Sequence, residues 1–179
     1  MDSLALITAY ENKTRAELAG ADALMPGADR VAWSGVLGAQ VMAVKGLSGP
    51  AEESGGPALS GEDGVALRKA LSALGFDPEA VFATLSRPVP DTDPEVIARR
   101  LRAQVEAVEP RAIVALDGEA AQDVASALGI RIPDFGQVVV GLGRRIVAVD
   151  GFEASLSDES RKAQVWQQLK VLTPAGPIW

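Results

Sequence analysis

The sequence predicts a single α/β domain over residues 1–179, with helices on both faces of a central, mainly parallel sheet in a three-layer α/β/α arrangement. Short valine-rich runs alternate with longer segments whose apolar residues recur at helical spacing. This alternation is typical of parallel strands joined by right-handed helical crossovers. A chain of 179 residues that is 47% hydrophobic is also long enough to bury one sizeable core.

Four apolar runs are the expected strands of the parallel sheet, at residues 41–45, 81–85, 112–116 and 145–149. Another valine-rich run precedes Gly141 and Gly143, which we interpret as a connection between two strands because no third glycine and no helix follow. Ligands of such sheets bind at the carboxyl ends of the strands. A site is therefore expected in the loops after the four strands, which follow Lys45, Leu85, Leu116 and Val149.

Helical spacing predicts five helices, at residues 2–18, 62–75, 94–108, 119–129 and 157–172. Gly20 is expected to stop the first helix. Asp93 is expected to cap the third helix, which Pro94 opens, and Ser157 is expected to cap the last. Residues 20–35 are expected to form a loop.

The composition excludes several kinds of site. The chain has no cysteine and no histidine, so thiolate nucleophiles, iron–sulfur clusters and imidazole ligands or bases are excluded. We expect no metal and no cofactor.

The amino-terminal residues mix acids with apolar side chains, unlike a signal peptide, and no apolar run is long enough to span a membrane. A cytoplasmic protein without membrane contact is expected.

The segment after Lys45 is rich in glycine and carries four acids, Glu52, Glu53, Glu62 and Asp63. Glycine-rich loops after a strand often hold phosphates, but four carboxylates repel them. Glu52 and Glu53 are candidates for positioning water as general bases, and Asp150 is a third candidate acid. The alternative is that Glu52 and Glu53 are solvated loop residues, which we favour. Lys45, Ser48 and Ser60 are weaker candidates for contacts with an anion or nucleobase.

The order of these segments resembles the uracil-DNA glycosylase superfamily, especially its small bacterial and archaeal branch that carries an iron–sulfur cluster. The segments "VKGLSG", "GGPALSG" and "GVALRKALSALGF" are similar to the family's first strand, its glycine-rich loops and its leucine-rich helix. "RAIVALDGEAAQDVASALG" is similar to a later strand and an alanine-rich helix, and "RIVAVDGFEASLSDESRKAQVWQQLKVL" to the last strand and closing helix. The resemblance covers about residues 4–172.

The resemblance places a ligand pocket around Gly46, Ser48, Ala58, Leu59, Leu85 and Gly151. The family's loop acid falls on Gly46, its stacking phenylalanine on Ala58 or Leu59, its base-reading asparagine on Leu85 and its histidine on Gly151. All four functional side chains are thus missing, and so are the cluster cysteines. The resemblance therefore implies a DNA-repair fold without its usual chemistry, a pseudoenzyme.

Three functions remain open. The first is a non-catalytic binding or assembly module in DNA metabolism with an unidentified protein partner; a small clamp-loader accessory subunit of bacterial replication has a similar fold without being a glycosylase. The second is a divergent glycosylase that excises uracil or a damaged base with Glu52, Glu53 or Asp150. The third is a small-molecule or nucleotide binder.

Weak or absent binding to duplex DNA is expected from the net charge of −7. The contrary evidence is the basic concentration formed by Arg99, Arg100, Arg102, Arg111, Arg144 and Arg145. The helical spacing of the first three favours a solvated helix face interleaved with acids over a nucleic-acid patch.

Overall fold

The computed structural model describes residues 3–27 and 29–174 and has a six-stranded sheet with the strand order β1-β3-β2-β4-β6-β5. The strands are β1 (Ser34–Gly35), β2 (Val41–Lys45), β3 (Val81–Leu85), β4 (Ala112–Ala115), β5 (Val139–Gly141) and β6 (Arg144–Ala148). The predicted three-layer α/β/α architecture with a mainly parallel sheet is confirmed.

The four predicted strands form the parallel centre of the sheet. Ala43 of β2 is paired with Ala83 on one side and with Val114 on the other, and Val114 is paired with Val147 of β6. Two short edge strands, β1 and β5, are antiparallel to their neighbours. The strand at β1 was missed because residues 20–35 carry no apolar alternation, whereas the connection between β5 and β6 is confirmed as a hairpin.

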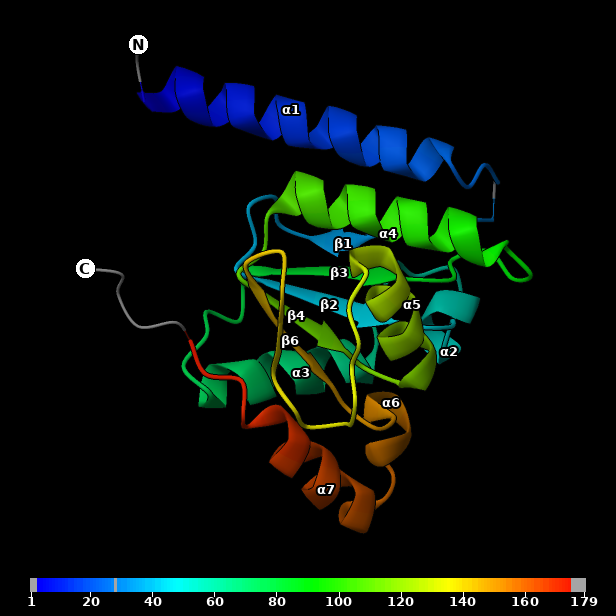
Figure 1. Cartoon of the computed structure of the whole chain (residues 1–179), viewed down its shortest axis with the longest axis vertical. Helices are drawn as coiled ribbons and strands as arrows, with labels where there is room; N and C mark the ends of the chain where they lie inside the picture. Colours follow the sequence, from blue (N-terminus) through cyan, green and yellow to red (C-terminus); the bar gives the residue numbers. More distant parts are fainter. Residues whose placement is uncertain (1–2, 28, 175–179) are drawn as a thin grey trace.

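Helices cover both faces of this sheet (Figure 1). One apolar core joins the sheet to α4 (Pro94–Val108) and α5 (Gly118–Leu128), and a second joins its other face to α3 (Glu62–Ala73) and α7 (Glu159–Leu169). The remaining helices are α1 (Ser3–Ala23), which lies along α4, and the short α2 (Pro50–Glu53) and α6 (Phe152–Ser155). Among the described residues, none of the helices combines the length and apolar character needed to cross a membrane.

The helix ends differ from the prediction by a few residues, and two of the differences, in α7 and α1, have a clear physical reason. Asp93 caps α4 by accepting a hydrogen bond from the Glu95 amide, as predicted, but α7 is capped by Asp158 and not by Ser157. Asp158 is the cap because its carboxylate accepts hydrogen bonds from two amides in the first turn, those of Ser160 and Arg161. The first helix runs through Gly20 to Ala23, since a single glycine weakens a helix without ending it. Its predicted first residue, Asp2, lies outside the described residues.

Arg100 of α4 ties three elements together and is fully buried. Its Nε and Nη2 donate to Oδ1 of Asp22 in α1, at 3.1 and 3.0 Å, and its Nη1 donates to the carbonyl of Leu85 at the end of β3, at 3.0 Å. Arg99 and Arg102 are exposed on the same helix. The expectation that all three arginines lie on a solvated face is therefore wrong for Arg100.

Candidate functional site

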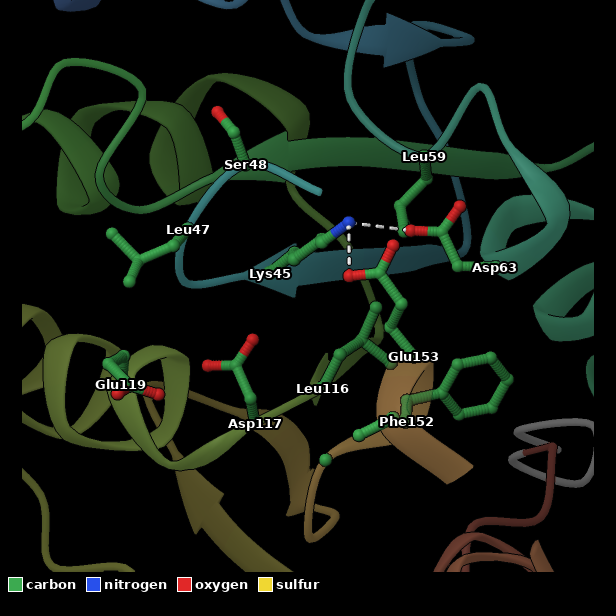
Figure 2. A pocket seen from close by; sticks show the side chains of 12 residues that line it. Lys45, Leu47, Ser48, Leu59, Asp63, Leu116, Asp117, Glu119, Phe152 and Glu153 are labelled. Carbon is green, nitrogen blue, oxygen red and sulfur yellow. Dashed lines mark hydrogen bonds and ion pairs between the residues drawn. The ribbon is translucent and has the colours of Figure 1, made fainter. Parts of the chain in front are cut away.

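The carboxyl ends of β2, β4 and β6 meet at one edge of the sheet and surround a cavity of about 190 Å³ (Figure 2). Its wall comes from the segment after β2, from the start of α5 and from α6. The residues that line it are Lys45, Leu47, Ser48, Leu59, Asp63, Leu116, Asp117, Glu119, Gly151, Phe152, Glu153 and Ala154. This is the edge at which the sequence predicts a site.

Lys45, the last residue of β2, is the centre of this site. Its side chain is 5% exposed, and its Nζ lies 3.0 Å from Glu52, 2.8 Å from Asp63 and 3.0 Å from Glu153. Figure 2 shows the contacts to Asp63 and Glu153. Burial opposes the charge of Lys45, but hydrogen bonds to the three carboxylates outweigh it and raise its pKa. The ammonium group is therefore protonated, and it is paired with all three carboxylates.

Both carboxylate oxygens of Glu52 are occupied. Oε2 accepts from Lys45 and from the Gly49 amide at 2.9 Å, and Oε1 accepts from the Leu59 amide at 2.8 Å. Burial by itself would raise the pKa of Glu52, yet these hydrogen bonds lower it below its ordinary value. A carboxylate with a lowered pKa and no free oxygen is a poor general base.

Glu52 also holds a strained residue beside the cavity. Leu59 has a left-handed backbone with φ of 54°, which costs a non-glycine residue about 1–2 kcal/mol. The hydrogen bond from its amide to Glu52 helps to keep this conformation. The ionised Glu52 is therefore part of the scaffold of the wall.

We expect acid to weaken the protein through Glu52. Because the folded-state pKa of Glu52 is lowered, its contribution to stability is complete above its unfolded pKa and is lost as the pH falls through the folded value. A hydrogen bond to a charged group contributes about 1.5–3 kcal/mol, so the loss should be large enough to measure. Urea unfolding between about pH 6 and pH 2 should show it, and Glu52→Gln should make the pH dependence shallower.

The matched control for this prediction is Glu53→Gln, since Glu53 is the exposed neighbour in the same helix. It should keep the pH dependence of the unaltered protein. Equal pH profiles for the two variants would contradict the role assigned to Glu52.

Asp117 closes the cavity on the side of α5. Its Oδ1 accepts from the Ala120 amide at 2.7 Å and caps α5, while its Oδ2 accepts from the Gly46 amide at 2.8 Å. Burial raises the pKa of Asp117, against the effect of these two hydrogen bonds. Asp117 thus fastens the segment after β2 to the start of α5.

Two glycines let the backbone approach these side chains. A Cβ on Gly46 would lie 2.6 Å from Oδ1 of Asp117 and 2.7 Å from Cβ of Glu119. A Cβ on Gly49 would lie 2.6 Å from Nζ of Lys45. Asp117 and Glu119 therefore occupy the space that a side chain at position 46 would need.

The predicted pocket residues are brought together only in part. Ser48, Leu59 and Gly151 line the cavity, and Gly46 lies beside it. Ala58 and Leu85 are buried in the core on the α3 side and do not line it.

The three candidate acids do not form one site. Glu52 is buried, so the interpretation as a solvated loop residue is wrong for it, whereas Glu53 is exposed as that interpretation predicts. Asp150 is half-buried, its amide donates to Gln168, and it does not line the cavity.

Sequence reasoning missed Asp117, Glu119 and Glu153, and it counted Asp63 only as one of the four acids of the glycine-rich segment. Asp117 had a local signal, because an aspartate that follows a strand and precedes Gly-Glu-Ala-Ala is typical of a helix cap. Glu153 had no comparable signal.

The oxygens of Glu52, Asp63 and Glu153 lie within 4.8 Å of one another, a spacing that could hold a metal ion, but the ammonium group of Lys45 lies among them.

The comparisons with known proteins add no family to this description. No protein-family model matches the chain, and no curated protein matches it.

Proposed function

We propose that the chain is a non-catalytic binding or assembly module of DNA metabolism, similar in fold to uracil-DNA glycosylases. The observation that carries the non-catalytic part is the pairing of Glu52 with Lys45 inside the site. The sequence resemblance supports the relation to that superfamily and to DNA metabolism.

The residues at three of the four functional positions of that family favour a site without base excision. Gly46 has no room for a catalytic side chain beside Asp117. Leu85 is buried away from the cavity and has no edge donor or acceptor for a base. Gly151 offers no side chain to an anionic leaving group.

The charges around the cavity favour weak binding of duplex DNA. The wall contains one positively charged group, the ammonium of Lys45, and four carboxylates. The carboxylates belong to Asp63, Asp117, Glu119 and Glu153. Phosphates approaching this edge meet an excess of negative charge. A protein partner fits this chain better than a nucleic acid.

We expect no release of uracil from single-stranded or double-stranded DNA. Loss of one donor to the leaving group commonly slows such chemistry by ~100–1000-fold, and the other losses add to it. Excision measured on uracil-containing oligonucleotides should match a control without protein. Turnover that survives in Glu53→Gln but disappears in Glu52→Gln would contradict the proposal and establish a divergent glycosylase.

The residues that line the cavity favour the small-molecule alternative as a second candidate function. Leu59, Leu116 and Phe152 form apolar wall, while Asp117 and Glu119 present carboxylates. This combination suits a compound with an apolar face and an amine edge. Isothermal titration calorimetry with amines and nucleosides distinguishes this candidate from a module that binds only protein.

A further inference from the structure

We propose that α1 is a detachable arm, which leaves α4 by local opening while the sheet and the other helices stay folded. While the arm is docked, Asp22 covers Arg100, which otherwise joins Arg99 and Arg102 at the surface of α4. The arm thereby controls how much positive charge α4 presents. This inference goes beyond the proposed function, because it depends neither on the cavity nor on DNA metabolism.

The arm buries little of its surface. Its buried residues are Thr14, Leu18 and Ala21, which lie on one stripe, whereas every residue from 3 to 13 is exposed. The arm lies along α4, which separates it from the sheet (Figure 1). Leu18 is the one large apolar side chain in the stripe. Because helices in proteins gain most of their stability from packing of this kind, the arm is weakly held.

Asp22 is the point at which the arm is clamped. Its Oδ1 accepts hydrogen bonds from Arg100 in the middle of α4, and its Oδ2 lies 3.5 Å from Nη2 of Arg30. Burial lowers the pKa of Arg100 in spite of the Asp22 carboxylate, so the pair does not fully offset the desolvation of the guanidinium group. Further back along the arm, Lys13 lies close enough to Glu109, just beyond α4, to feel its charge. The two helices are therefore antiparallel.

The contact between the arm and α4 also contains polar groups that lack partners. Oγ1 of Thr14 and both amide atoms of Gln104 are buried, and none of the described residues offers them a hydrogen bond. Gln104 follows Arg100 by one helical turn, and Thr14 precedes Asp22 by about two turns, so in antiparallel helices both lie along this contact. A buried polar group without a partner destabilises the docked state, whereas water satisfies the group once the arm opens.

Hydrogen exchange of the unaltered full chain measures this opening without any substitution. A free helix of 21 residues is only marginally stable in water, so undocking exposes its amides to exchange. The amides of residues 14–21 should therefore exchange at least about a hundredfold faster than those of β2.

Thiol labelling measures the same opening at a single position. The chain has no cysteine, so Ala21→Cys in the arm and Ala83→Cys in β3 each introduce one thiol, at residues that are both 1% exposed. A water-soluble maleimide should label Ala21→Cys at least about a hundredfold faster than Ala83→Cys. Low urea concentrations should hardly change the first rate and should steeply raise the second, because the second requires global unfolding.

Two further substitutions, each combined with Ala21→Cys, test the weak contact and the clamp. Thr14→Val keeps the shape of the side chain and removes the unpartnered hydroxyl group, so labelling should slow by about tenfold. Asp22→Asn leaves Arg100 without its anion, so labelling should accelerate by at least about tenfold. The matched control is Thr8→Val, which makes the same change at an exposed residue of the arm and should alter the rate by less than about twofold.

Circular dichroism and urea unfolding of each variant give the global stability with which its labelling rate is compared. Exchange and labelling that follow global unfolding at both positions overturn the proposal, because α1 then belongs to the same cooperative unit as the sheet. Labelling that is equally fast with Thr14→Val and with Thr8→Val overturns it as well, since the unpartnered groups would then not weaken the contact. Fast labelling in the arm that slows with Thr14→Val and accelerates with Asp22→Asn supports it.

Discussion

Lys45→Met should destabilise the protein by about 3–5 kcal/mol, because it removes the cation and leaves the charges of the buried carboxylates uncompensated. Glu52 is 0% exposed at its side chain and Asp63 is 2% exposed, so water cannot replace the lost ammonium group at either of them. Methionine is close to lysine in length, which separates the loss of charge from the loss of packing. Urea unfolding followed by circular dichroism gives the free energy of unfolding.

Acid should partly restore this variant, since protonation removes the uncompensated charge of Glu52. The difference from the unaltered protein should therefore shrink as the pH falls towards about 4. The control is Lys13→Met, because Lys13 pairs with Glu17 on the exposed surface of α1. Its effect should stay within about 0.5 kcal/mol. A loss below about 1 kcal/mol in Lys45→Met would show that the cluster is not a stabilising element.

Gly64→Ala should cost about 2–3 kcal/mol, because the added methyl group would overlap the backbone carbonyl oxygen of Leu59. Gly64 is buried in the first turn of α3, directly after Asp63, and Leu59 lines the cavity. Neither backbone can move without disturbing the wall of the site. Thermal unfolding by calorimetry measures the loss.

Gly20→Ala provides the opposite case. Gly20 lies inside α1, and a Cβ there meets nothing within 4 Å. Alanine favours the helix over glycine, so this variant should gain about 0.5–1 kcal/mol. A destabilised Gly20→Ala, or a neutral Gly64→Ala, would show that these glycines are selected for reasons other than the space around them.

The arrangement of the sheet follows from the sequence because its signal is local and repeated. The runs at β2 and β3 are short and apolar, and a helix of clear period follows each of them along the chain. Right-handed crossovers then bring the strand ends to one edge. The same reasoning predicted where a cavity lies, since the loops that follow Lys45, Leu116 and Val149 all contribute to it.

The side-chain partners inside the cavity could not be predicted in the same way. Lys45 contacts Glu52, 7 residues away, and Asp63, 18 residues away, together with Glu153 from the opposite end of the chain. A sequence gives the number of charges in a loop but not the direction of each side chain. Glu52 and Glu53 are neighbours in sequence, yet one faces Lys45 and the other faces solvent.

The buried Arg100 has a consequence for the order in which the chain can fold. Asp22 and Arg100 are separated by 78 residues, so α1 leaves the ribosome well before its partner on α4 has been made. At about 5–20 residues per second, that interval is roughly 4–16 s. During synthesis α1 has no α4 to pack against, and Leu18, buried in the finished protein, has no apolar neighbours from that helix. Helix α1 is made before α4, so its docking waits for the middle of the chain.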